Sequence, residues 1–342
     1  MEYRLQHTPT ARLTNGKLIA ASATILTLAA CGGGGGVETS TPTIGPLLSV
    51  DAGTANEALA SGKILVASSV ASVTADQQTA LTIMDANAPN IQLSQRTNGH
   101  LTLKIDGKTY DFSADDYFVE SDGSGRIYGY EKDIAVEAGS GDITWVGLFS
   151  WQGELDDALA ESNSNFAQIW QYYLVDEANG LNTGKFATVT FTSDDFLNAA
   201  TGIFTYTGYG QMHEMPASQY TGYGNRNEID FDVSLSLNMD DSSFSGVFNN
   251  VETRTRQSNV PAPDYSPVGG QFDVTNGSIV DGKLTADFSA DATLLTALGA
   301  TSMTGTLDGD LFGEEADQAA GTLAATSESG GVSFGHFRAS KL

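Results

Sequence analysis

The sequence predicts an all-β protein, in which an N-terminal β-rich domain is followed by an eight-stranded antiparallel β-barrel. Short runs of alternating apolar and polar residues recur along the chain, as expected for strands with one buried face. Gly, Asn and Asp separate these runs, and Asn-Gly and Asp-Gly pairs mark tight hairpins. We expect the first domain to cover residues 51–200 and the barrel to cover residues 201–342.

The first 30 residues have the layout of a bacterial lipoprotein signal peptide. A basic leader precedes an apolar run from Leu18 to Ala30. Leu28-Ala29-Ala30-Cys31 resembles a lipobox, in which the Cys sulfur receives a lipid. Cys31 is the only cysteine, so it cannot form an internal disulfide. We expect cleavage before Cys31 and acylation of that residue, including palmitate.

A lipid anchor at Cys31 predicts an outer-membrane location. Acyl chains contribute about 0.8 kcal/mol per buried CH₂, so two or three of them hold a protein firmly. The apolar run is shorter than the roughly 20 residues that a membrane-spanning helix needs. Gly32 follows the cysteine, in place of the Asp that often marks inner-membrane retention. Residues 31–50 are rich in Gly, Thr and Pro, which predicts an extended tether.

The chain is strongly acidic, with a formal net charge of −26. Such a surface repels phosphate backbones, so we expect no nucleic-acid partner. The acidity either serves solubility, including in salty water, or favours basic protein partners and divalent cations. The Asp residues do not have the spacing of an EF-hand loop. We expect a monomer.

The first domain contains a predicted three-stranded meander. Ile91–Leu93, His100–Ile105 and Lys108–Phe112 alternate, and the turns between them are Asn98-Gly99 and Asp106-Gly107. Further strands are expected at Arg126–Tyr130, Ile143–Trp151, Ile169–Val175 and Lys185–Phe191, a short helix at Leu155–Glu161, and either helix or strand over Ala55–Val73.

The second domain is more regular, and Glu228–Leu237 shows its pattern best. Ile229 and its alternate neighbours are apolar, whereas Glu228, Asp230 and Asp232 fall on the other face, which we expect to be wet. Seven further strands are expected at Gly202–Gly208, Phe244–Val251, Gly270–Val274, Lys283–Phe288, Met303–Leu307, Gly321–Ala325 and Val332–Phe337. Eight strands close into a barrel whose interior side chains fill it.

Three stretches of the second domain resemble one family. Thr201–Tyr209 is similar to its first strand, Gly-x-x-x-Tyr-x-Gly, and Glu228–Gly246 has its alternating strand followed by Ser-Gly. Met303–Gly313, leading into Glu315–Leu323, is similar to Gly-x-Phe-Tyr-Gly-x-x-Ala-x-Glu-x-Gly-Gly-x-Phe. The family is that of the transferrin-binding-protein-B-like surface lipoproteins, which includes factor-H-binding proteins and haem-scavenging, haemophilin-like lipoproteins.

The third stretch departs from the family pattern at four places. Leu311-Phe312, Gln318, Ala320 and Leu323 stand where the family has Phe-Tyr, Glu, Gly and Phe. The resemblance covers the barrel region and the lipid anchor, and residues 51–200 take the place of the family's handle domain. It implies a surface-exposed lipoprotein, exported by a translocon of the surface lipoprotein assembly modulator type. It also implies binding of a host protein or haem for iron capture, or of a complement regulator.

One segment is a candidate ligand loop between the first two barrel strands. Its candidate residues are Tyr209, Met212, His213, Met215, Tyr220 and Tyr223. His, Met and Tyr side chains can ligate haem iron or a soft metal. Met and aromatic residues also suit a protein-binding surface. A loop without any ligand is the third interpretation, so no cofactor is assigned, and haem is kept as a possibility.

Two other histidines and a group of aromatic residues have structural interpretations. We expect His100 to be an exposed hairpin residue and His336 to point into the barrel, on the same strand face as Val332 and Phe334. The aromatic group consists of Trp145, Trp151, Trp170, Tyr172 and Tyr173. We expect most of this group to lie in the core, and any exposed member to be an anchor for a partner.

The sequence indicates a non-enzymatic binding protein. It contains no nucleophile elbow, no His-Glu-x-x-His zinc motif and no phosphate-binding loop. Two alternatives remain open. One is a structural or adhesive lipoprotein without a small ligand, which an exposed apolar patch would favour. The other is a glycan hydrolase, which a cleft holding two carboxylates would favour.

Overall fold

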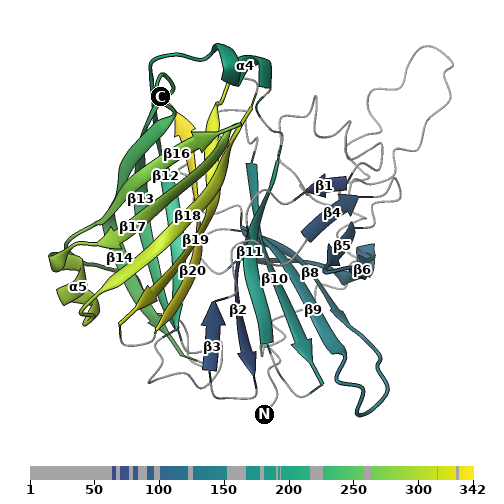
Figure 1. The fold of residues 1–342 in the computed structure, drawn as a ribbon. Coiled ribbons are helices and arrows are strands. Elements are labelled where there is room, and N and C mark those ends of the chain that lie inside the picture. Colours follow the sequence, from purple (N-terminus) through teal and green to yellow (C-terminus); the bar gives the residue numbers. More distant parts are fainter. Residues whose placement is uncertain are drawn as a thin grey trace, which may run out of the picture. The chain divides into compact units, whose positions relative to one another are not determined.

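Strands dominate the computed structural model of the chain (Figure 1). It describes residues 64–66, 70–76, 80–83, 91–95, 101–121, 126–151, 167–177, 181–189, 192, 194–215, 226–257, 263–313, 315–328 and 331–342. These residues form antiparallel sheets of four, seven and nine strands and fall within one compact unit. The predicted boundary between two domains therefore stays a prediction, as do the signal peptide and tether, which lie outside the described residues.

A four-stranded sheet, sheet A, has the strand order β1-β4-β5-β6. Its strands are β1 (Ile64–Val66), β4 (Ile91–Gln95), β5 (Leu101–Ile105) and β6 (Lys108–Phe112). The predicted meander is confirmed at these strands. Asp106 and Gly107 both have positive φ, 49° and 82°, as a type I′ hairpin turn requires. The Asn98-Gly99 turn and His100 lie outside the described residues.

A seven-stranded sheet, sheet B, has the order β3-β2-β11-β10-β9-β8-β7. Its strands are β2 (Val70–Asp76), β3 (Ala80–Ile83), β7 (Tyr117–Ser121), β8 (Arg126–Asp133), β9 (Ile143–Trp151), β10 (Ala167–Asp176) and β11 (Leu181–Val189). The ambiguous stretch Ala55–Val73 is strand where it is described, and the expected helix Leu155–Glu161 lies outside the described residues. We refer to sheets A and B together as the handle.

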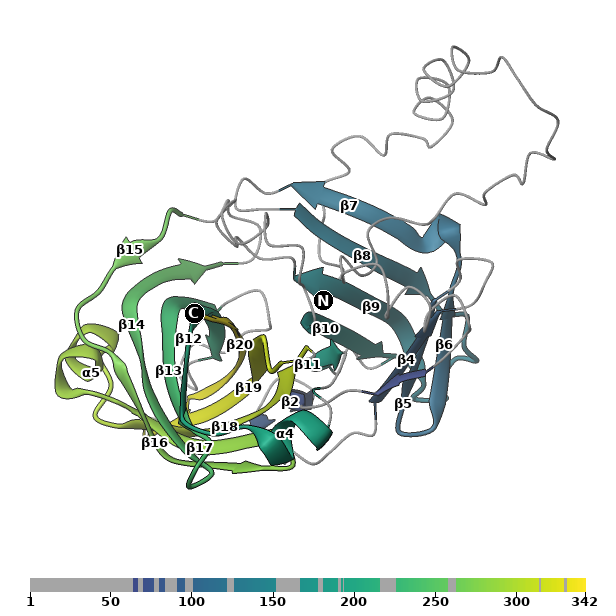
Figure 2. The same ribbon diagram turned by 90° about the horizontal axis from the view of Figure 1, so that it is seen from above.

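The third sheet closes into an eight-stranded antiparallel barrel, because β13 pairs with both β12 and β14 (Figure 2). Its strands are β12 (Ile203–Met215), β13 (Arg226–Asn238), β14 (Ser243–Arg256), β16 (Phe272–Val280), β17 (Lys283–Ala290), β18 (Met303–Phe312), β19 (Gln318–Ser327) and β20 (Val332–Lys341). The two-residue strand β15 (Ser266–Pro267) adds to β14. All eight predicted strands are confirmed, although most are longer than predicted.

Three short helices complete the described structure. They are the 3₁₀ helix η1 (Ala114–Asp116), α4 (Asp194–Ala199) and α5 (Ala292–Leu298), and α4 and α5 lie at opposite ends of the barrel (Figure 1). The Asp291 carboxylate caps α5 by accepting a bond from Leu294 N at 2.7 Å, and Gly299 ends it at φ 66°. None of the helices in these parts of the chain combines the length and apolar character needed to cross a membrane.

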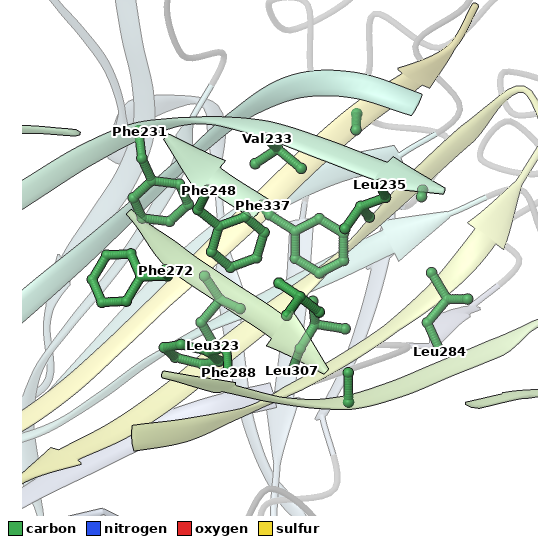
Figure 3. Packing of buried hydrophobic residues seen from close by; sticks show 14 of the residues in the cluster. Phe231, Val233, Leu235, Phe248, Phe272, Leu284, Phe288, Leu307, Leu323 and Phe337 are labelled. Atoms are coloured by element: carbon green, nitrogen blue, oxygen red, sulfur yellow. The ribbon is translucent and has the colours of Figure 1, made fainter. Parts of the chain in front are cut away.

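The barrel interior is packed with aromatic and aliphatic side chains (Figure 3). The Phe231 and Phe248 rings stack with centroids 4.9 Å apart, and Phe337 stacks on Phe248 at 6.5 Å. Gly309 makes room for this packing, since a Cβ there would lie 3.0 Å from the Phe337 ring and 2.5 Å from the Ala320 carbonyl oxygen. Each buried aromatic removes a large apolar area from water, so this core is a main source of stability.

Alternation along sheet B gives the handle two buried faces. Trp170, Tyr172 and Phe186 pack with the side chains of sheet A. Phe149 and Tyr173 point the other way and belong to the same apolar cluster as barrel residues. The sequence predicts that most of the aromatic group lies in the core. Burial confirms this for Trp170, Tyr172 and Tyr173. Trp145 is half-buried, and the Trp151 side chain lies outside the described residues.

The barrel wall that meets sheet B is therefore buried on both of its faces. Its apolar contact residues are Met215 from β12 and Val332 and Phe334 from β20, which pack with Tyr173 and Leu181 of the handle. A strand that is buried on both faces loses the simple alternation of an exposed strand. This wall positions the candidate site.

Candidate functional site

A group of polar side chains is buried where the barrel wall meets the handle. We define the buried polar cluster as Lys185 of β11, Gln211 and His213 of β12, Arg226, Glu228 and Asp230 of β13, and His336 of β20. Every member is at most 8% exposed. Buried polar and charged groups destabilise a fold unless they bond to one another, so the contacts within this cluster decide its chemistry.

Strand register explains why these side chains share one face. His213 pairs with Glu228 on one side and with Phe334 on the other, and Gln211 pairs with Asp230 and His336. Residues that pair in adjacent antiparallel strands point to the same side of the sheet. Those positions point away from the barrel core, whereas the intervening apolar side chains, such as Met212 and Ile229, belong to it.

Lys185 connects the handle to the barrel. Its Nζ donates to Gln211 Oε1 at 3.1 Å and lies 3.0 Å from His336 Nδ1, which accepts from the ammonium form of Lys185 because that form can only donate. Burial lowers the pKa of Lys185 to about 7, even though Asp230 and Glu228 favour its charged form. The lysine is thus close to losing its charge at neutral pH.

The two histidines of the cluster are held in their neutral form. Burial, followed by the nearby Lys185 charge, lowers the pKa of both His213 and His336 well below the ordinary histidine value. His213 Nε2 lies 3.0 Å from Gln211 Oε1, so Nε2 must carry the proton, because an amide oxygen only accepts. His336 accepts at Nδ1 and therefore carries its proton at Nε2.

Glu228 is the anionic centre of the cluster. Arg226 Nη2 donates to Glu228 Oε1 at 2.6 Å, Arg254 Nε donates to Oε2 at 2.5 Å, and Arg256 Nε lies 3.5 Å from Oε1. Burial opposes ionisation of Glu228, but the three arginines outweigh it and hold its pKa below the usual range. The guanidinium of Arg254 also lies 4.1 Å from the centre of the Tyr265 ring, a cation–π contact.

Asp230 lies two residues from Glu228 but has the opposite electrostatic character. Burial raises the pKa of Asp230, although hydrogen bonds from Tyr209, Gln211 and Tyr265 favour its charged form. Its Oδ1 is buried without a hydrogen-bond partner among the described residues. The pKa values of these two carboxylates on one strand face thus shift in opposite directions, because Arg226, Arg254 and Arg256 lie within ion-pair distance of Glu228.

The predicted ligand loop is wrong in its placement. Strand β12 continues to Met215, so Tyr209, Met212, His213 and Met215 are strand residues. Met212 belongs to the barrel core, Met215 belongs to the apolar contact with the handle, and His213 is fully buried. The segment does not alternate because both of its faces are covered. Tyr220 and Tyr223 lie outside the described residues.

The prediction for His336 is also wrong in one respect. It shares a strand face with Val332 and Phe334, as expected, but that face points to the handle and not into the barrel. Phe337, one residue on, is the side chain that enters the core. Nothing in the sequence of this strand tells the two faces apart, since both carry large side chains.

Sequence reasoning misses the rest of the cluster. It places Glu228 and Asp230 on a wet face, and the structure confirms exposure only further along, at Asp232. It gives Lys185 no role beyond the start of a strand. One signal exists in the sequence: Arg226, Arg254 and Arg256 are three of only 16 basic residues in a chain of charge −26, and they fall on two neighbouring strands. Within the described residues, no group of three His, Cys, Asp or Glu side chains could hold a metal ion.

Comparisons with known proteins give matches only among solved structures, since no protein family and no curated protein matches the chain. A double mutant of transferrin-binding protein B (TbpB) from Haemophilus parasuis is similar at 14% identity, covering 80% of this chain and 45% of that one, with a TM-score of 0.40. TbpB from Neisseria meningitidis is similar at 12% identity, covering 80% and 58%, with a TM-score of 0.36.

A third similar structure is HpuA from Kingella denitrificans in complex with human haemoglobin. Its identity to this chain is 13%, with coverage of 82% of this chain and 87% of that one and a TM-score of 0.37. The chain spans only 45% and 58% of the two TbpB chains. The closed eight-stranded barrel itself follows from the strand pairing, independently of these similarities.

Proposed function

We propose that the chain is a non-enzymatic binding lipoprotein on the outer membrane, displayed at the cell surface, that captures iron, haem or another nutrient through a protein or haem ligand. One observation carries the proposal. The centre of the barrel is occupied by its own phenylalanine and leucine side chains, so a ligand has to bind on outer surfaces and loops. A packed barrel suits contact with a macromolecule better than enclosure of a small molecule.

The predicted anchor supports the same proposal. Acylated Cys31 would insert in outer-membrane lipid, and residues 31–50 would extend the folded part away from it. The sequence resemblance adds export by a translocon of the surface lipoprotein assembly modulator type. A tethered protein on the cell surface can bind a large ligand that does not cross the outer membrane.

We keep the segment from Tyr209 to Tyr223 as the proposed ligand segment, although its first part, up to Met215, is strand and not loop. Tyr209 is half-buried at the edge of the cluster, and Tyr220 and Tyr223 follow the end of β12 in sequence. Burial of His213 means that a haem iron could reach its ring only if the wall opened. The tyrosines are therefore the stronger candidates for direct contact, because aromatic side chains dominate interface energetics.

The single cysteine allows a direct binding test. The chain that follows the predicted cleavage site is immobilised through biotin on Cys31, which reproduces the orientation of the anchor, and is titrated with haem, haemoglobin and transferrin. We expect saturable binding of one of these probes. Tyr220→Ala with Tyr223→Ala should weaken it by about tenfold or more, since a hot-spot aromatic contributes over about 1.4 kcal/mol. Val280→Ala, at a side chain that is 62% exposed, is the control.

Haem as a ligand has its own test. Absorption at the Soret band is followed during a haem titration of the wild type, His213→Ala and His100→Ala. A one-to-one shift that is lost only in His213→Ala would establish haem ligation by His213. Absence of any saturable binding to all three probes would overturn the iron-capture proposal.

The structural or adhesive alternative would then remain. It predicts an exposed apolar patch on the handle. Among the described residues, the exposed large apolar side chains are Ile203, Val280 and Leu342, all in the barrel region. No observation on the described part of the handle therefore favours that alternative.

A further inference from the structure

We infer that Lys185, His213 and His336 form a proton-operated latch between the handle and the barrel wall, which holds at neutral pH and loosens when the pH falls. The inference goes beyond the proposed function and does not depend on it. It concerns contact between two parts of this chain, whatever ligand the chain binds.

The latch follows from the direction of two hydrogen bonds. Two hydrogen bonds of Lys185 cross from sheet B to the barrel, one to Gln211 and one to His336. His336 can accept at Nδ1 only while that nitrogen is unprotonated. Protonation of His336 would replace this bond by two cationic groups whose nitrogens lie 3.0 Å apart, with little water to screen them.

Among the described residues, both charged groups that act on His336 are cations. Lys185 faces it from β11, Tyr209 faces it from β12 with ring centroids 6.5 Å apart, and Arg338 acts on it from its own strand β20. The residue paired with it on β19 is Thr322, which is uncharged. Protonation would therefore add a third positive charge to two that are already present.

His213 is in a similar position. Its ring packs edge-on against Phe334 at 5.5 Å and bonds to Gln211, while Arg226 of β13 and Arg256 of β14 both disfavour its charged form. Glu228, its neighbour across the β12–β13 ladder, already binds three arginines. The other carboxylate of the cluster, Asp230, favours the charged form of Lys185, and burial raises the pKa of Asp230 itself.

The sign of the pH effect can be worked out from these groups. A histidine whose pKa is lower in the folded chain stabilises it fully above the unfolded value of about 6.5, and this stability is lost as the pH falls below that value. The pKa of Lys185 is lowered to about 7 in the folded chain, so this lysine also reduces stability as the pH falls, but it does so at pH values above about 7. Glu228 reduces stability only when the pH falls below the ordinary glutamate pKa, because its own pKa is lowered. Asp230 has a raised pKa, so its protonation increases stability as the pH falls. Between about pH 6.5 and about pH 5, the loss of stability in this cluster therefore comes from the histidines.

Two methionines on β12 provide the readout. Met215 belongs to the apolar contact with the handle, whereas Met212 belongs to the barrel core, and each is at most 1% exposed. Hydroxyl-radical footprinting with mass spectrometry measures the oxidation of each side chain in the chain that follows the predicted cleavage site. Opening of the latch exposes Met215 alone, whereas general unfolding exposes both.

We expect Met215 oxidation to rise about tenfold or more between pH 7.5 and 5.0, because each histidine changes the opening equilibrium by up to tenfold per pH unit. Met212 should stay protected. The double variant His213→Gln/His336→Gln keeps hydrogen-bonding groups but cannot be protonated, so its Met215 should not respond to pH. His100→Gln, which leaves the three latch residues unchanged, should behave as the wild type.

A second variant covers the case in which the double variant does not fold. Lys185→Met removes the cation that disfavours the imidazolium forms, so its Met215 response should be smaller than that of the wild type. The latch is overturned if Met215 oxidation does not rise at pH 5.0, if it rises equally in the double variant, or if Met212 rises together with Met215. An undiminished response in Lys185→Met would also overturn it.

Discussion

The two faces of one set of barrel strands are buried by different interactions. On β12, β13 and β20 the inward face carries residues such as Met212, Phe231 and Phe337, which belong to the apolar core. The outward face of the same strands carries Gln211, Glu228 and other members of the buried polar cluster. The inner face depends on filled volume, whereas the outer face depends on charge balance and on complete hydrogen bonding.

This difference predicts two kinds of sensitivity. Apolar packing is lost in proportion to the atoms removed, and volume-conserving changes are tolerated. A charge network fails when one partner is removed, because the others remain buried and uncompensated. The predictions below test that contrast.

The largest effect is expected for Phe248→Ala in the core. The Phe248 ring contacts Phe231, Phe288 and Phe337 and is fully buried, so its removal leaves a cavity at the centre of the barrel. We expect the free energy of unfolding to fall by about 3–5 kcal/mol, measured by urea denaturation. Val280→Ala, at an exposed position, should change it by less than about 0.5 kcal/mol. A small loss for Phe248→Ala would mean that the core is not the main source of barrel stability.

The next effect is expected for Glu228→Gln on the outer face. The substitution keeps the shape of the side chain but removes the anion that holds Arg226, Arg254 and Arg256. We expect a loss of about 3 kcal/mol in the free energy of unfolding, because the buried Arg226 and the partly buried Arg254 and Arg256 lose the anion that they share. Glu252→Gln, an exposed glutamate on β14, is the matched control and should be near neutral. Equal effects of the two substitutions would contradict the central role of Glu228.

A smaller effect is expected from the titration of Lys185. With its pKa lowered to about 7, the folded chain has released this proton at pH 9 while the unfolded chain still binds it. Stability should therefore rise with pH, by about 2 kcal/mol between pH 7 and 9. Urea denaturation of Lys185→Met at the same two pH values should lack this gain. A rise of the same size in the variant would assign the pH dependence to other groups.

The barrel could be predicted from the sequence because its inner face imposes a period of two. Along β13, Ile229 to Leu237 alternates without a break, and the structure buries those apolar residues in the core. The first barrel strand is predicted too short at the end where its outer face is buried as well. The segment from Tyr209 to Met215 has large side chains at successive positions, which favours interpretation as a loop, although it continues β12.

The buried polar cluster could not be predicted, because its members are brought together by contacts of long range. Lys185 and His336 are 151 positions apart in the chain, and only the packing of sheet B on the barrel joins them. Periodicity shows which residues share a strand face, but it does not show what covers that face. For Glu228, periodicity correctly predicts that the side chain points away from the barrel core, but it predicts exposure to water where the structure buries the side chain.

The smallest effect is expected for Asp230→Asn, and it separates the two carboxylates of β13. Because burial raises the pKa of Asp230, its charge is unfavourable in the folded chain, and stability from this group increases as the pH falls through that raised value. An uncharged amide should therefore be tolerated, with a change in the free energy of unfolding within about 1 kcal/mol at pH 7, measured by urea denaturation. Tyr265 and Gln211 can still bond to the amide that replaces the carboxylate, which limits the loss. A loss as large as that of Glu228→Gln would show that charge balance in the cluster is shared by both carboxylates, and the contrast drawn between them would fail.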